Sequence, residues 1–419
     1  MLPEPILDLP LETRVMPNGV TLNVLRRDTQ DVLRLDIVVE AGVFEQSQPL
    51  QCLFTNRLLR EGTVRHSSSL IARRLDSYGA WLEQSVGSHY SFLTLYSLGR
   101  IFAPTARLLA DILRHPAFPE RRFCVVRDNS RSQFLIGLTR GSVIARRLFT
   151  RAVYPDGYPL GRLTEPSDYE RLDTDSLRQF HSAFYTSGRT SLYLSGRVTP
   201  AAIATEERLF GTELWGNDEP STESRKAVND IVEHPEPSHI VETIPTLAQA
   251  SVRMGMLMMP AGTSDYYEMR VLNAILGGYF GSRLMTSERE QKGYTYGIQS
   301  DLSTFSRDTL LTITCECHAD KADALVTDVI SEMQRLAEEP VPDEELDLVR
   351  NYLLGELCRN HDGVFSLADA AIYTATMGLP TTHLRNTAET IRTVTSVQLQ
   401  TLAQRYFRPD LLTTVVVRP

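Results

Sequence analysis

An arginine and a tyrosine seven residues apart, Arg289 and Tyr296, are the side chains of this sequence best suited to chemistry. They follow three glycines and a serine, Gly277, Gly278, Gly281 and Ser282. A guanidinium and a phenol O–H aimed at one point can stabilise a carbonyl oxygen that is developing negative charge. Spacing alone does not establish that role, because such a pair at a helix end is commonly a surface ion pair and a packed aromatic.

Ser282 and Gly293 predict the limits of a helix that would position the arginine. Serine is a preferred N-cap, so we expect the helix to begin near Arg283 and to end at Gly293. The following run has strand character and carries Tyr296. Arg289 lies one helical turn before the predicted end, so we expect it to converge with Tyr296 beside that strand. The glycines predict a flexible turn that brings backbone N–H groups close to another chain.

The order of these features resembles the C-terminal-half signature of the insulinase/pitrilysin metallopeptidases, which include the mitochondrial processing peptidases. The shared elements are the glycine turn, Ser-Arg-Leu, Arg-Glu, and then a glycine and a tyrosine. In that family the Arg/Tyr pair contacts substrate and helps to stabilise the transition state. The resemblance therefore implies this role for Arg289 and Tyr296 alone. From their flexible turn we also expect Gly277, Gly278, Gly281 and Ser282 to bind substrate.

The family's zinc site is degenerate in this sequence. The family carries H-x-x-E-H on a helix of its first half, where two histidines bind Zn²⁺ and the glutamate is the general base. Counting back from the landmark Gly62-Thr63 places this motif on Leu53, Asn56 and Arg57, and the distal ligand near Gln133. Leucine has no donor atom, asparagine cannot act as the base, and arginine stays protonated. We therefore expect no metal and no cofactor on this chain.

A census of histidines supports this expectation without any alignment. No two of the nine histidines are four residues apart, and neither H-E-x-x-H nor H-x-x-E-H occurs. A zinc site built from residues distant in sequence stays open, although nothing in the spacing points to one. No G-x-S-x-G occurs, and the glycine turn is not followed by the Lys-Ser/Thr of a phosphate-binding loop.

The composition is that of an ordinary globular protein, with 42% hydrophobic and 23% charged residues. A net charge of −9 and the lack of a basic tract argue against nucleic-acid binding. Five cysteines without a repeated spacing favour a reducing compartment. The first residues do not resemble a signal peptide, and no apolar run reaches about 18 residues. The sequence predicts a cytoplasmic protein that does not bind membranes.

A pattern that recurs within the chain predicts two duplicated domains. Val39-Glu-Ala41-Gly42 recurs some 220 residues later as Met259-Pro-Ala261-Gly262, and a helix–strand unit recurs at nearly the same offset. We expect an N-terminal domain over 1–213, a polar linker over 214–238 and a C-terminal domain over 239–419. The fold class is α+β, each domain being a mostly antiparallel sheet with helices on one face. The resemblance implies that the two domains enclose a chamber.

The residues and the resemblance together predict a non-catalytic subunit of a metallopeptidase. It would bind extended peptide and supply Arg289 and Tyr296 to a homologous partner that bears the zinc. The alternative is a metal-free homodimeric scaffold or peptide-binding protein, which has no need of that pair. An independent zinc protease is disfavoured by the residues at the four zinc-site positions.

Overall fold

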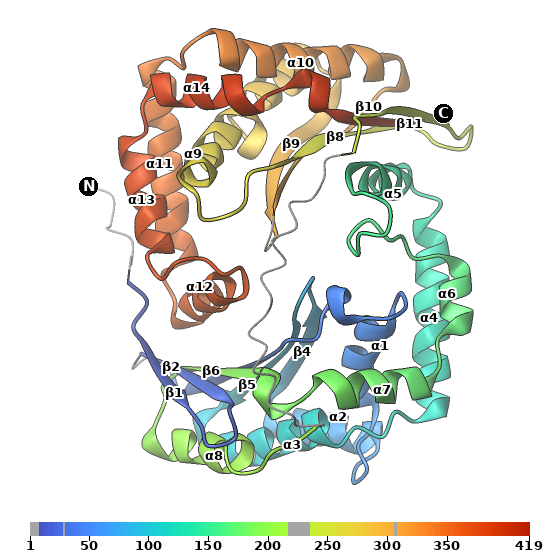
Figure 1. The fold of residues 1–419 in the computed structure, drawn as a ribbon, viewed down its shortest axis with the longest axis vertical. Coiled ribbons are helices and arrows are strands. Elements are labelled where there is room, and N and C mark those ends of the chain that lie inside the picture. Colours follow the sequence, from blue (N-terminus) through green and yellow to red (C-terminus); the bar gives the residue numbers. More distant parts are fainter. Residues whose placement is uncertain (1–7, 28–29, 217–234, 306–307) are drawn as a thin grey trace.

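The computed structural model describes residues 8–27, 30–216, 235–305 and 308–419. Figure 1 shows two sheets, each with its own layer of helices, at opposite ends of the molecule. We call residues 8–216 the N-terminal half and residues 235–419 the C-terminal half. The sheet of the N-terminal half lies at the bottom of the view and the sheet of the C-terminal half at the top.

The two sheets share one strand order. The N-terminal sheet runs β1-β2-β6-β3-β5-β4 and the C-terminal sheet runs β7-β11-β8-β10-β9. Apart from the additional edge strand β1, the strands correspond one to one, with β6 and β3 central in the first sheet and β11 and β8 central in the second. In each sheet one of the shared pairs is parallel (β2 with β6, β7 with β11), and the other shared pairs are antiparallel. The strands are β1 (Leu11–Val15), β2 (Thr21–Arg26), β3 (Val32–Val39), β4 (Trp81–Val86), β5 (Ser91–Leu98), β6 (Thr190–Gly196), β7 (His239–Thr243), β8 (Ala250–Met258), β9 (Thr295–Thr304), β10 (Thr309–Cys317) and β11 (Thr413–Arg418).

The helices follow the chain in the same way. Those of the N-terminal half are α1 (Gln51–Leu58), α2 (Ser68–Tyr78), α3 (Phe102–Arg114), α4 (Glu120–Gly137), α5 (Gly141–Val153), α6 (Pro166–Arg171), α7 (Thr174–Phe184) and α8 (Pro200–Phe210). Those of the C-terminal half are α9 (Ser264–Asn273), α10 (Ala322–Glu338), α11 (Asp343–Asn360), α12 (Val364–Thr376), α13 (His383–Thr393) and α14 (Ser396–Tyr406). The 3-10 turns are η1 (Val43–Glu45), η2 (Leu59–Glu61), η3 (Gly99–Ile101), η4 (Ser187–Arg189), η7 (Ala319–Lys321) and η8 (Pro409–Leu411).

Each half also lends a helix to the other half's sheet. Helix α5 packs on β8 and β11 of the C-terminal sheet, and α12 packs on β2 and β6 of the N-terminal sheet. Figure 1 shows both helices on the sides of the sheets that face the middle of the molecule. Phe149 of α5 lies in an apolar cluster with Leu257 and Val415, and Leu367 of α12 lies in one with Val38. The halves are therefore joined by two buried apolar interfaces.

This exchange explains why the central strands do not alternate between buried and exposed residues. Strands covered on both faces are expected to be apolar throughout. In β11, Val416 belongs to the core under the outer helices, whereas Val415 and Val417 pack with α5. Gly255 of β8 is required at the same interface, because a Cβ there would lie 2.8 Å from Cζ of Phe149 on α5.

The α+β fold class with two packed sheets is confirmed, and the structure adds the exchanged helices to the predicted outer layers. A hairpin turn at Asn18-Gly19 joins β1 to β2, with Gly19 at φ +86°. Most of the predicted linker lies outside the described residues, so its boundaries stay a prediction. The described part of the chain contains no helix whose length and apolar character would let it span a membrane.

Candidate functional site

The glycine turn is held against the edge strand of the C-terminal sheet. Helix α9 continues into a π-helical turn, η5 (Ala274–Gly278), which ends at the glycines. Asn273 Nδ2 donates to the Ser300 carbonyl oxygen (3.1 Å), and Ser300 Oγ donates to the Asn273 carbonyl oxygen (3.2 Å). A Cβ on Gly277 would lie 2.8 Å from the Ser300 backbone nitrogen, so only glycine allows this approach. The turn is thus packed closely against β9 of its own chain, and its approach to another chain stays a prediction.

The next helix has the predicted limits but not the predicted cap. It begins at Arg283, becomes the π-helical segment η6 (Met285–Gln291), and is followed by Gly293 at φ +65°. The Ser282 hydroxyl, however, is buried and has no hydrogen-bond partner among the described residues. The preceding turn is tight, with Ser282 N donating to the Tyr279 carbonyl oxygen (3.1 Å), and the side chain lies inside the protein at 1% exposure. The prediction that Ser282 caps the helix with its side chain was wrong.

Arg289 and Tyr296 lie on neighbouring elements, η6 and β9, which pack together. The Arg289 guanidinium carbon lies 4.5 Å from the centroid of the Phe280 ring, and Phe280 belongs to the glycine turn. Tyr296 is 90% exposed. The two side chains are not hydrogen-bonded to each other in the part of the chain that is described. The structure thus brings both residues to the glycine turn without joining them directly.

A cavity of about 750 Å³ adjoins the turn and is lined by both halves of the chain. Its walls are the glycine turn, the outward face of β9, parts of β8 and β10, and the start of α5. The lining residues include Ser142, Ala145, Arg253, Gly277, Gly278, Tyr279, Phe280, Tyr296, Gln299 and Asp301. Arg289 is absent from the lining and reaches the cavity through its contact with Phe280. Phe280 and helix α5 were not identified from the sequence as part of the site. The sequence signal for Phe280 is an aromatic residue within a glycine turn.

Arg253 is the cation of the cavity wall. It extends over the ring of Phe149 on α5, 5.4 Å from its centroid, and its Nε is buried without a partner among the described residues. Burial lowers the pKa of Arg253, and the nearby Arg146 lowers it further. An arginine in this setting retains donors for a carbonyl or carboxylate that enters the cavity.

The four predicted zinc-site positions do not form a metal site. Leu53 packs against the apolar core, and Asn56 is 1% exposed, with Nδ2 3.4 Å from the Tyr185 hydroxyl. Arg57 donates from Nη1 to Ser130 Oγ of α4 (3.1 Å), one helical turn before the exposed Gln133. Over the described residues, no three His, Cys, Asp or Glu side chains lie close enough together to hold a metal ion. A neutral or cationic set of this kind does not fit Zn²⁺.

A second cavity, of about 600 Å³, lies between Arg57 and the edge strand β4. Trp81 of β4 lines it and is 64% exposed. Strand β4 ends the N-terminal sheet as β9 ends the C-terminal one, so each cavity has an edge strand in its wall. Each edge strand pairs with a neighbour on one side only. On the other side of β9, Ile298 N already donates to Met285 Sδ (3.4 Å) and the Ser300 carbonyl oxygen accepts from Asn273 Nδ2 (3.1 Å), so only part of that row is available for a further strand.

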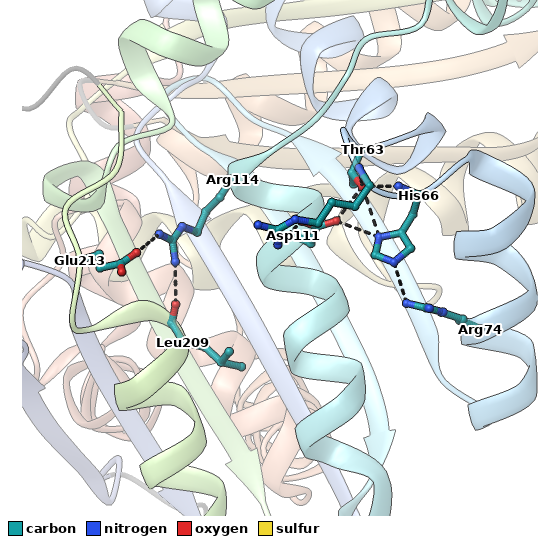
Figure 2. A network of polar contacts seen from close by, with 8 residues as sticks. Thr63, His66, Arg74, Asp111, Arg114, Leu209 and Glu213 are labelled. Atoms are coloured by element: carbon teal, nitrogen blue, oxygen red, sulfur yellow. Dashed lines mark hydrogen bonds and ion pairs between the residues drawn. The ribbon is translucent and has the colours of Figure 1, made fainter.

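His66, the histidine that follows Arg57 most closely in the sequence, belongs to a structural network shown in Figure 2. Thr63 Oγ1 donates to Asp111 Oδ2 (2.6 Å), and His66 Nδ1 is 3.0 Å from the same oxygen. Arg74 Nη1 lies 2.8 Å from His66 Nε2, so the ring accepts there and donates through Nδ1 to Asp111. The network fixes the Gly62-Thr63 landmark on α3 and leaves no nitrogen of His66 for a metal.

Comparisons with known proteins show what this chain is similar to. Residues 171–353 match the peptidase M16 inactive domain. An uncharacterized zinc protease of Bacillus subtilis, YmxG, is 22% identical over 350 residues, which cover 81% of this chain and 82% of the relative. One from Rickettsia bellii is also 22% identical, with 82% of each chain covered.

Solved structures have the same fold over nearly the whole chain. The peptidase M16 inactive domain from Pseudomonas fluorescens superposes with a TM-score of 0.87 at 19% identity and covers 98% of both chains. A protease from Helicobacter pylori gives 0.89 at 14% identity, with full coverage of both chains. Residues 171–353 therefore belong to the peptidase M16 inactive-domain family, the whole chain has the fold of the M16 inactive domain from Pseudomonas fluorescens, and the sequence contains no H-x-x-E-H motif.

Proposed function

We propose that this protein is a non-catalytic subunit that binds extended peptide for a homologous partner bearing zinc. The observation that carries the proposal is the cavity of about 750 Å³, whose wall combines the glycine turn, the exposed Tyr296 and the edge strand β9. No catalytic metal is assigned to this chain, because the residues at the family's ligand positions cannot bind one. Zinc and the general base would come from the partner.

Peptide would bind by adding a strand to β9. An edge strand offers main-chain hydrogen bonds, and the alternate side chains of the incoming peptide enter the pockets beside it. The outward residues Gln299 and Asp301 line the cavity, so one face of the added strand would meet them. Its other side would meet the glycine turn, where the backbone can approach closely.

Arg289 and Tyr296 would support the oxyanion formed when the partner's zinc-bound water attacks the peptide. Their donors would act on the charge that develops in the transition state, which is where hydrogen bonds accelerate a reaction. The 90% exposure of Tyr296 leaves its hydroxyl available to a substrate held against another chain. To donate to the oxyanion, the Arg289 guanidinium would either move away from the Phe280 ring or remain in contact with that ring.

Both the partner and the location are part of the proposal. A zinc-bearing homologue fits the missing ligands, and a second copy of this chain would suit only the alternative, a metal-free scaffold. No disulfide joins the five cysteines in the described structure, in keeping with the proposed cytoplasmic location. The exposed Tyr296 favours the peptide-handling role, since a scaffold gains nothing from an exposed aromatic in a cavity wall.

The test is reconstitution with a homologue that carries H-x-x-E-H. Arg289→Ala and Tyr296→Phe should each lower the turnover of an unstructured peptide by about 10-fold or more, as loss of one oxyanion donor does. Assembly measured by sedimentation should be unchanged. Arg359→Ala is the control, because Arg359 is an exposed arginine of α11 that lies 3.6 Å from Glu356. Wild-type turnover in both variants would reject the proposal and favour the scaffold.

A further inference from the structure

Strand β9 contains an extra residue directly at Tyr296. From Thr304 to Ile298, its residues pair one to one with Thr309 to Cys315 of β10. The next pair is Thr295 with Cys317, so Tyr296 and Gly297 together face the single residue Glu316. Two residues opposite one define a β-bulge, a feature that often re-aims a side chain beside an active site.

The bulge determines the face on which Tyr296 lies. Ile298 and Ser300 are buried, whereas Gln299 and Asp301 are exposed, as regular alternation requires. Continued alternation would put Tyr296 on the buried face with Ile298, because a shift of one residue exchanges the two faces of a strand. The extra residue instead leaves both Tyr296 and Gly297 exposed and returns Thr295 to the buried face.

Thr295 holds this bulge together through one hydroxyl group. Its Oγ1 accepts from Gly297 N (3.0 Å) and lies 2.7 Å from the Glu316 carbonyl oxygen, to which it donates. The Gly297 carbonyl oxygen, at 2.9 Å, is the competing acceptor for the same proton. The hydroxyl therefore ties the extra residue to its own strand and to β10. Valine has the same shape but could make none of these bonds.

We propose that Thr295 is a positioning residue, which keeps Tyr296 in the cavity by closing the bulge. The effect that we expect on turnover rests on the proposed function. The effect that we expect on the structure of the bulge rests only on the hydrogen bonds of Thr295. Thr295 itself is only 9% exposed and touches no substrate. Its replacement should therefore act on turnover only through the position of Tyr296.

The experiment compares Thr295→Val, Thr295→Ser and Tyr296→Phe in the reconstituted two-chain enzyme. Thr295→Val should lower kcat by about 10-fold, close to Tyr296→Phe, while Thr295→Ser, which keeps the hydroxyl, should stay within about twofold of wild type. Hydrogen exchange at the Gly297 amide should quicken at least tenfold in Thr295→Val and stay slow in Thr295→Ser. Thr309→Val is the matched control, because the buried Thr309 hydroxyl has no hydrogen-bond partner among the described residues.

The outcomes separate this inference from the proposed function. Loss of activity in Tyr296→Phe with normal kcat in Thr295→Val would overturn the positioning role and leave the proposed function standing. Normal kcat in Tyr296→Phe would reject the catalytic role proposed for Tyr296, and the exchange rate of Gly297 would then decide the role of Thr295 on its own. Unchanged exchange in Thr295→Val would overturn that role whatever the activity. If Thr295→Val does not fold, Thr295→Ala takes its place in both measurements.

Discussion

The guanidinium of Arg289 lies over the ring of Phe280, 4.5 Å from its centroid, and this contact joins helix η6 to the glycine turn. Phe280 is 63% exposed and lines the cavity, so it is accessible to a ligand as well as to the arginine. A cation over an aromatic face at an exposed site contributes about 0.5–1 kcal/mol. The ring thereby limits the directions in which Arg289 can point.

The first prediction concerns this ring. Phe280→Ala should weaken binding of an extended peptide by about two- to fivefold, the equivalent of one exposed cation–π contact. Fluorescence anisotropy with a labelled peptide would measure the affinity. Phe280→Tyr keeps an aromatic face for Arg289 and serves as the control. Equal affinity in the alanine variant and in wild type would show that the ring does not organise the site.

The residues at its two ends were sufficient to predict where the helix between the glycine turn and β9 begins and ends. Gly293 follows from a helix-capping rule that depends on neighbours in the sequence, whereas the helix starts at Arg283 without the Ser282 cap from which that start was predicted. The Ser282 side chain does not cap the helix, because the preceding turn places it inside the protein, and the sequence does not reveal this burial. Helix α5 in the cavity wall could not be predicted either, since its partner strands β8 and β11 lie far along the chain.

The second prediction concerns the ion pair under α12. Arg34 of β3 is 5% exposed, and its Nε donates to Asp36 (2.9 Å) while Nη2 bonds Asp369 of α12. Burial raises the pKa of Asp36, whose charge Arg34 offsets. Arg34→Ala would leave Asp36 buried without its cation and should cost about 3–5 kcal/mol of unfolding free energy, measured by urea denaturation. Arg26→Ala, at an exposed pair with Glu12 (3.0 Å), should cost under about 1 kcal/mol. Equal midpoints for these two variants would contradict the prediction.

The third prediction concerns Glu206 of α8, a buried acid. It is 0% exposed, and neither carboxyl oxygen has a hydrogen-bond partner among the described residues. Burial raises its pKa from 4.5 to about 8. The folded state therefore holds a proton that the unfolded state releases, and stability should fall as pH rises from about 4.5 to about 8, then level off.

Glu206→Gln removes this titration. The variant should melt a few degrees above wild type at pH 9, and the difference should shrink as pH falls towards 4.5, as measured by calorimetry. Glu207→Gln is the neighbouring control, because Glu207 is exposed and pairs with Arg14 (3.2 Å). A pH profile identical to wild type in Glu206→Gln would mean that the carboxyl group is already solvated.

The fourth prediction restores the zinc ligands. Histidines four apart share one helix face, so Leu53→His and Arg57→His on α1, with Asn56→Glu and Gln133→Glu, should rebuild a site on α1 and α4. This variant should bind about one equivalent of zinc by elemental analysis after dialysis. The same variant with Arg57 retained should bind none, because the guanidinium cannot act as a ligand. A folded variant without zinc would show that these positions do not correspond to the family's ligands.

The most direct test of the central claim is a paired assay of zinc content and peptide hydrolysis. Both would be measured on this chain alone and then together with a homologue that carries H-x-x-E-H. We expect no bound zinc and no hydrolysis for the chain alone, and hydrolysis in the pair that exceeds that of the homologue by itself. Stoichiometric zinc with turnover in the lone chain would contradict it, as would a pair no more active than the homologue.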